Sequence, residues 1–135
     1  MRWLCGLGFH LILAGTAVQA SAEISDQQAL DSANKEIVKF HVNPQHWDVH
    51  IDKTLQDWRI TRDSWENWVN TVAKGRATDT YARIAEIEAA IKGKEVWLVV
   101  YKKLVPPGVR VFHTHAVVFL DATSGEVLAI INPEE

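Results

Sequence analysis

The apolar residues that follow Ser25 repeat at helical spacing, directly after a capping box. Ser25 and Gln28 stand three positions apart, so the side chain of each can accept a hydrogen bond from the backbone N–H of the other at a helix N-terminus. Pro44 disfavours continuation of a helix beyond Asn43. The pattern predicts an amphipathic helix over 26–40. Its apolar side consists of Ala29, Leu30, Ala33, Ile37 and Val38.

A second helical repeat is rich in tryptophan and predicts a helix over 63–74. Asp63 and Glu66 form a capping pair at its expected start. Apolar residues at i, i+3, i+4 and i+7 share one helix face, and such a face normally packs into a core. We therefore expect core packing for the apolar face of this helix, which carries Trp65, Trp68, Val69 and Val72.

The segment 45–60 has a pattern of period two in its first half. Trp47, Val49 and Ile51 alternate with polar residues, as expected for a half-buried strand. Pro44 would equally suit the first position of a short helix. We favour an extended segment here.

The segment 81–92 fits two periods. As a helix, it places Ile84, Ile87 and Ile91 on one face. As a strand, it alternates strictly and could turn at Gly93 to pair with the strand that follows. Because that next strand needs a partner, we favour the strand.

The last third of the chain predicts a series of strands. β-Branched and aromatic residues fill 95–104, 109–120 and 126–131, with Pro106-Pro107-Gly108 and the turn residues 121–125 between them. Helices come first and strands last, which is the α+β pattern. The expected fold is therefore α+β, with N-terminal helices packed on a three- to four-stranded antiparallel meander.

The N-terminal segment is typical of a secretory signal peptide. Arg2 is followed by an apolar run that is too short to span a bilayer comfortably, and the run ends in small residues. Cleavage after Ala22 fits best, and cleavage after Ala20 fits nearly as well. The sequence thus predicts a signal peptide over 1–22 and a single domain over 23–135, with a periplasmic or secreted location.

Charge and cysteine content exclude several function classes. The formal net charge of −3 gives no electrostatic attraction to nucleic acid or to an anionic membrane. Cys5, the only cysteine, lies in the predicted signal peptide, so the domain has no disulfide, thiolate nucleophile or thiolate metal ligand. No apolar stretch after residue 22 is long enough for integral membrane association.

The last hairpin carries a family resemblance. After the capped first helix, the expected sheet finishes in a hairpin that reads Phe119-Leu120-Asp121-Ala122-Thr123-Ser124-Gly125-Glu126-Val127. This arrangement resembles small exported PepSY-type and NTF2- or cystatin-like domains over the last third of the chain and the first helix. The resemblance implies a cystatin/NTF2-like shape. It also implies a non-catalytic domain that binds a peptide, a protein or a small ligand on a sheet curved around helices, and it transfers no catalytic residue.

Four histidines are the candidate metal ligands. His113 and His115 stand two apart on an expected strand, so both point to one face. Together with His46 or His50 they would suit zinc or copper. The alternative is that these histidines only pack, because Val111, Val117 and Phe119 share the same expected face.

No nucleophile elbow, phosphate-binding loop or zinc-protease motif is present. We therefore predict an exported, non-enzymatic binding module without a cofactor, for a protein, a peptide or a small apolar ligand. One alternative is a periplasmic metal-binding protein that uses the histidines, and another is a small cavity enzyme of isomerase or hydratase type. The candidate binding surface comprises Trp47, Trp58, Trp97 and Tyr101.

Overall fold

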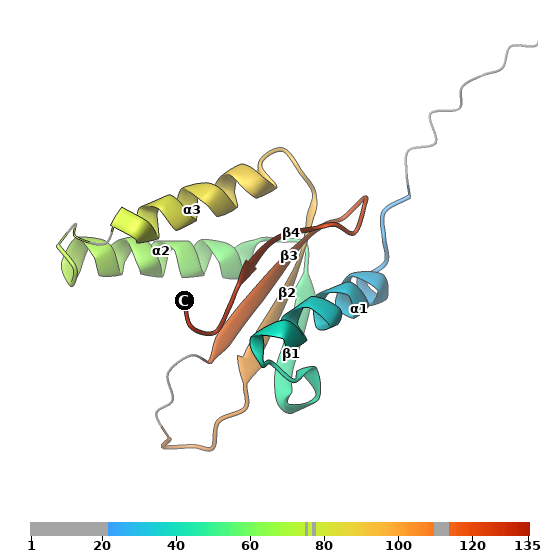
Figure 1. Cartoon of the computed structure of the whole chain (residues 1–135), viewed down its shortest axis with the longest axis horizontal. Coiled ribbons are helices and arrows are strands. Elements are labelled where there is room, and N and C mark those ends of the chain that lie inside the picture. The colour runs from blue at the N-terminus through green and yellow to red at the C-terminus, as the bar shows by residue number, and fades with distance from the viewer. Residues whose placement is uncertain (1–21, 75, 77, 110–113) are drawn as a thin grey trace, which may run out of the picture.

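A computed structural model of the chain describes residues 22–74, 76, 78–109 and 114–135. The predicted signal peptide, apart from Ala22, and the candidate ligand His113 lie outside these residues. In chain order the described elements are α1 (Asp26–Ile37), the 3₁₀ turns η1 (Val38–Phe40) and η2 (Pro44–His46), β1 (Trp47–Asp52), α2 (Gln56–Thr71), α3 (Thr78–Ile91), β2 (Val96–Lys103), β3 (His115–Asp121) and β4 (Val127–Ile131) (Figure 1).

The four strands form one antiparallel sheet in the order β1-β2-β3-β4. In the middle of the sheet, Val100 of β2 pairs with His50 on one side and with Val117 on the other. Strands β2, β3 and β4 follow one another as a meander, and β1 adds to the free side of β2. The expected α+β architecture with an antiparallel sheet is therefore confirmed.

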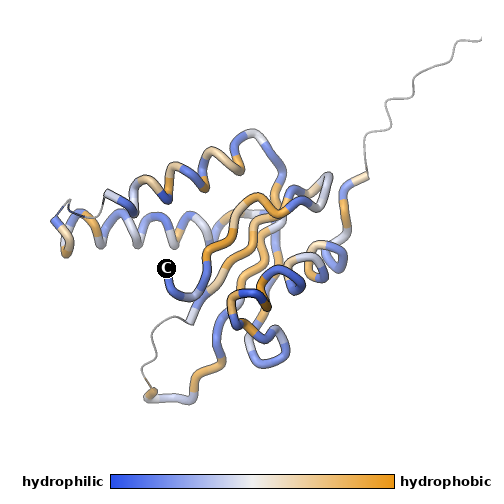
Figure 2. The backbone as a smooth tube through the Cα atoms, in the orientation of Figure 1, coloured by the Kyte–Doolittle hydropathy of each residue, from blue (hydrophilic) through white to orange (hydrophobic). Residues whose placement is uncertain are grey.

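Both faces of the sheet are covered by helices, so the central strands are apolar on both sides. Leu98 and Val100 point into a cluster with residues of α2 and α3, whereas Val99 and Tyr101 point into a second cluster with α1. Figure 2 shows this concentration of apolar residues along the strands. A strand buried on both faces has a continuous apolar run, not an alternating one, which explains the run in β2.

Helix α1 begins and packs as the sequence predicts. Ser25 Oγ accepts from the backbone N–H of Gln28 at 3.1 Å, and Gln28 Oε1 accepts from the backbone N–H of Ser25 at 2.8 Å. Ala29, Ala33 and Ile37 are fully buried at successive turns of the helix. The small side chains bring α1 close to the sheet.

The prediction of a strand over 81–92 is wrong, because this segment is the helix α3. Ile84, Ile87 and Ile91 are buried against the sheet, while Ala85 and Ala89, which a strand would have buried with Ile87, are exposed. Strand β2 does not need this segment as its partner, because it pairs with β1, from much earlier in the chain.

Helix α2 begins seven residues earlier than the sequence predicts, at Gln56 in place of Asp63. Asp63 therefore lies inside the helix, where it pairs with Arg62 at 3.4 Å and caps nothing. Leu55, with a φ of 57°, precedes the helix without a side-chain cap. A polar residue at that position would have been a stronger sequence signal for the helix start.

Candidate functional site

Helices α2 and α3 form a hairpin that extends past the end of the sheet (Figure 1). The open side of this hairpin contains a pocket of about 510 Å³. Residues from both helices and the C-terminal segment line it: Ser64, Trp65 and Trp68 from α2, Asp79, Thr80 and Arg83 from α3, and Glu135. The pocket thus forms where the apolar side of the hairpin has no strand beneath it.

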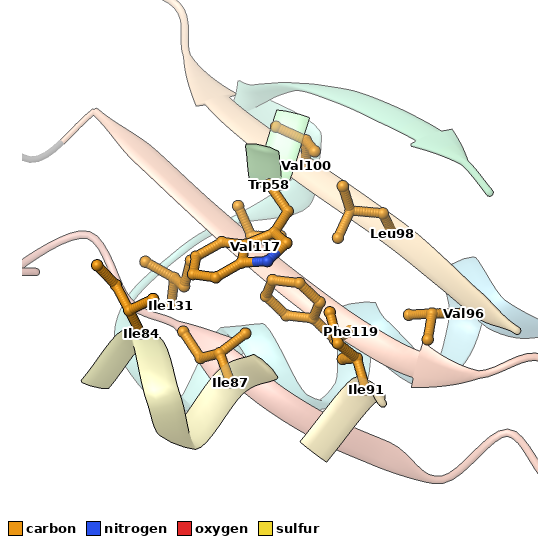
Figure 3. Close-up of a cluster of buried hydrophobic side chains, with 10 residues drawn as sticks. All are labelled: Trp58, Ile84, Ile87, Ile91, Val96, Leu98, Val100, Val117, Phe119 and Ile131. Atoms are coloured by element: carbon orange, nitrogen blue, oxygen red, sulfur yellow. The ribbon is translucent and has the colours of Figure 1, made fainter. Parts of the chain in front are cut away.

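The tryptophans of α2 become more exposed to solvent from the start of the helix toward its end. Trp58, over the sheet, is 1% exposed and packs edge-on against Phe119, with ring centroids 5.6 Å apart (Figure 3). Trp65 is half-buried and packs edge-on against Trp58 at 6.0 Å. Trp68, farther out, is 49% exposed. The same helix therefore contributes a core tryptophan at one end and a solvent-exposed one at the other.

Arg83 forms the wall of the pocket and ties α3 to the C-terminal segment. Its Nε lies 2.7 Å from Glu135 Oε1, its Nη1 lies 3.1 Å from Glu86 Oε2, and its guanidinium also donates to the backbone carbonyl of Ile130. Burial alone would lower the pKa of Arg83, but Glu135 and Glu86 together raise it above the ordinary value. The positive charge in the pocket is therefore already paired with carboxylates.

The pocket has the features of a small-ligand site. Its size falls within the usual range for such sites, roughly 300–1,000 Å³. Two indole rings give an apolar lining, and a few polar side chains surround them. Flat apolar groups stack well on indole, while polar groups at the rim fix orientation.

The structure corrects the predicted binding surface. Trp58 and Tyr101 are 1% and 0% exposed, so neither lines an open surface. Trp47 and Trp97 are half-buried and pack against the cluster under α1. The indole N–H of Trp97 donates to the carbonyl of Ile24 at 3.2 Å. Helix α1 and the segment before it cover the sheet face that we expected to be open.

The predicted histidine set is not assembled among the described residues. Of the candidate ligands, only His50 belongs to a described group of at least three close donor atoms, and its companions there are Asp52 and Asp57. His46 ends the turn before β1. His115 lies on β3 opposite Lys102, and its buried Nε2 has no hydrogen-bond partner among the described residues. Burial, followed by the charge of Lys102, lowers the pKa of His115.

His50, Asp52 and Asp57 lie at the junction of β1 and α2. Their donor atoms are all within 4.8 Å of one another, and His50 Nε2 lies 2.8 Å from Asp52 Oδ2. The backbone N–H of Thr54 donates to the other oxygen of Asp52 at 2.9 Å, which fixes the carboxylate. Burial opposes ionisation of Asp52, but this hydrogen bond and His50 lower its pKa. The group therefore presents one imidazole and two carboxylates.

Sequence reasoning missed the pocket because its residues are scattered. Asp79, Arg83 and Glu135 carry no motif, and they meet only through the packing of the hairpin. The apolar face of 63–74 predicted core packing instead, and that prediction is wrong at its outer end, where Trp68 is 49% and Val72 67% exposed.

No protein-family model, curated protein or solved structure matches this chain. Within the described residues, none of the helices combines the length and the apolar character that crossing a membrane requires.

Proposed function

We propose that this protein is an exported binding module whose pocket between α2 and α3 takes a small ligand with a flat apolar body. The observation that carries the proposal is Trp68, which is 49% exposed at the edge of a 510 Å³ pocket. Export is the part of the proposal that rests on the sequence of 1–22 alone.

A ligand that covers the indole rings would gain binding free energy from the apolar surface that it buries. Covering the exposed half of a tryptophan removes roughly 120 Å² from water, which is worth about 3 kcal/mol before the cost of immobilising the ligand. Trp65 adds a second ring to the same pocket. Contacts of this kind support binding without requiring any chemical step.

The test uses three water-soluble probes with one phenyl ring: benzyl alcohol, benzoate and benzyltrimethylammonium. Neither the indole N–H of Trp65 nor that of Trp68 forms a hydrogen bond among the described residues, whereas Trp58 donates to Glu88 at 3.1 Å. We expect at least one probe to shift the indole N–H signals of Trp65 and Trp68 saturably in ¹H–¹⁵N NMR spectra, and to leave that of Trp58 in place.

Two variants make this result specific. Trp68→Ala should abolish the saturable shift, and the matched control Trp47→Phe, on β1, should keep it. The proposal fails if no probe shifts these signals, or if the Trp68→Ala variant binds the probes as the unaltered protein does.

The group at the start of α2 favours a second candidate function, metal binding. His50, Asp52 and Asp57 offer three donors, which is the number of protein ligands in catalytic zinc sites. The hydrogen bond from Thr54 orients Asp52, as outer partners of metal ligands commonly do. This site differs from the histidine set that the sequence suggests, and only His50 is common to both.

Thermal unfolding in EDTA and then in added Zn²⁺ tests the second candidate. A ligand that binds only the folded state raises the unfolding temperature with the logarithm of its free concentration. We expect a saturable rise that His50→Ala removes and His46→Ala, the neighbouring control, retains. An equal rise in both variants, or no rise at all, would reject the site.

A further inference from the structure

The charges around the tryptophan-lined pocket are unequal. Arg83 brings one positive charge, and Asp79 and Glu135 bring two negative ones. Each nitrogen of the Arg83 guanidinium already has an acceptor, because Nε contacts Glu135, Nη1 contacts Glu86 and Nη2 donates to the carbonyl of Ile130. A ligand therefore meets a guanidinium group whose charge is already paired with carboxylates.

Asp79 supplies the second carboxylate of the pocket, beside that of Glu135, which pairs with Arg83. It lies in the first turn of α3, where the helix N-terminus favours a negative charge. Within the described segments, no hydrogen bond or ion pair engages its carboxylate, although Arg83 lies one turn farther along the same helix. The pocket thus combines one available negative charge with the rings of Trp65 and Trp68.

We propose that the ligand of this pocket is a small organic ammonium ion, in a refinement that rests on the binding function proposed above. Indole is the best aromatic partner for a cation, because its faces carry negative charge. A quaternary or alkylated ammonium also has an apolar surface, so it satisfies the rings and the carboxylate at once. An anionic ligand would instead be repelled by the carboxylate of Asp79, while the charge of Arg83 is already paired with Glu135 and Glu86.

A second hollow beside Trp68 has the opposite character. Lys74 and Arg76 line it, together with Trp68, Val72 and Ala73. A cation would be repelled there and attracted to the pocket that Asp79 lines. The distribution of charge therefore assigns the ammonium ion to the pocket between the helices.

The experiment measures dissociation constants of the three phenyl probes by isothermal titration calorimetry, with the indole signals of Trp65 and Trp68 as the check on location. We expect benzyltrimethylammonium to bind at least about fivefold more tightly than benzyl alcohol, and benzoate to bind most weakly. Raising the salt concentration should weaken only the binding of the cation.

A pair of variants isolates the charge. Asp79→Asn should weaken benzyltrimethylammonium binding about two- to fivefold and leave benzyl alcohol binding unchanged. Asp48→Asn, which changes the net charge equally on the exposed side of β1, should change neither.

The outcomes separate the two proposals. Absence of any saturable binding at Trp65 and Trp68 refutes the binding function itself. Binding of benzyl alcohol or benzoate at this pocket with equal or greater affinity than benzyltrimethylammonium keeps the binding function and refutes the ammonium class. An Asp79→Asn variant with unchanged preference for the cation refutes the role of Asp79.

Discussion

At the scale of single residues, the position of a tryptophan along α2 decides its role. Trp58 contacts Phe119 and Trp65 and donates to Glu88, whereas Trp68 is half exposed. We expect Trp58→Phe to lower the free energy of unfolding by about 2 kcal/mol, because it leaves a cavity and removes one of the two hydrogen bonds to Glu88 Oε1, the other coming from Arg62. Trp68→Phe should change it by less than about 0.5 kcal/mol. Urea denaturation measures both, and equal losses would contradict the assignment of Trp58 to the core.

Tyr101 should make stability sensitive to alkaline pH. Burial raises its pKa well above the ordinary value near 10, and its hydroxyl donates to Asn34 Oδ1 at 2.7 Å. The folded state therefore retains a proton that the unfolded chain releases. This contribution to stability is complete below about pH 10 and is lost as the pH rises above that value.

The measurement compares urea denaturation of the unaltered protein and of Tyr101→Phe at pH 8 and pH 11. The variant should be less stable at pH 8, by about 1 kcal/mol, and the difference should shrink at pH 11. Tyr81→Phe, at a residue that is 41% exposed, serves as the control. A difference that does not depend on pH would show that Tyr101 ionises normally.

At the scale of elements, the sequence predicts a helix or turn correctly where a capping or turn residue marks its end. The capping box of Ser25 and the turn that ends at Gly125 are both present, and Gly125 has a φ of 75° that suits glycine. The start of α2 has a weaker signal, since Leu55 offers no side-chain cap and Thr54 Oγ1 accepts from the backbone N–H of Gln56 at 3.3 Å. The sequence of α3 fits both the helical and the strand period. The segment is a helix because β2 already has β1, from much earlier in the chain, as its partner.

The capping box should contribute measurably to the stability of α1. Ser25→Ala removes the acceptor for the N–H of Gln28, and we expect a loss of about 1 kcal/mol in the free energy of unfolding. Ser32→Ala, inside the same helix, should have no cost or a slight gain, because alanine has the higher helix propensity. Urea denaturation of both variants should thus show a loss of stability for Ser25→Ala only. A Ser25→Ala variant as stable as the unaltered protein would rule out this role.

At the scale of the whole molecule, the sheet stabilises the two helical layers unequally. Helix α1 lies over the strands, whereas the hairpin of α2 and α3 continues beyond them (Figure 1). The sequence defined the apolar faces of the helices but not which part of each face would be covered. That depends on the lengths of strands that are distant in the chain. The pocket is a consequence of this mismatch, so no local pattern could have predicted its members.

Because the outer part of the α2–α3 hairpin does not pack on the sheet, we expect its amide hydrogens to exchange faster than those of the strands. Glu135 is one link between the hairpin and the C-terminal segment, because its carboxylate pairs with Arg83 of α3 and accepts from the backbone N–H of Asn132 at 3.0 Å. We expect Glu135→Gln to speed amide exchange in the first half of α3 by about two- to fivefold, which corresponds to a partly exposed ion pair. Exchange in β2 and β3 should stay the same.

Glu134→Gln is the matched control for this link. Glu134 is exposed, its side chain takes part in no ion pair among the described residues, and its replacement alters the net charge equally. If both variants speed exchange in α3 alike, the effect comes from net charge and not from the link to Arg83. If only Glu135→Gln does so, the ion pair with Arg83 restrains local opening of α3 at the wall of the pocket.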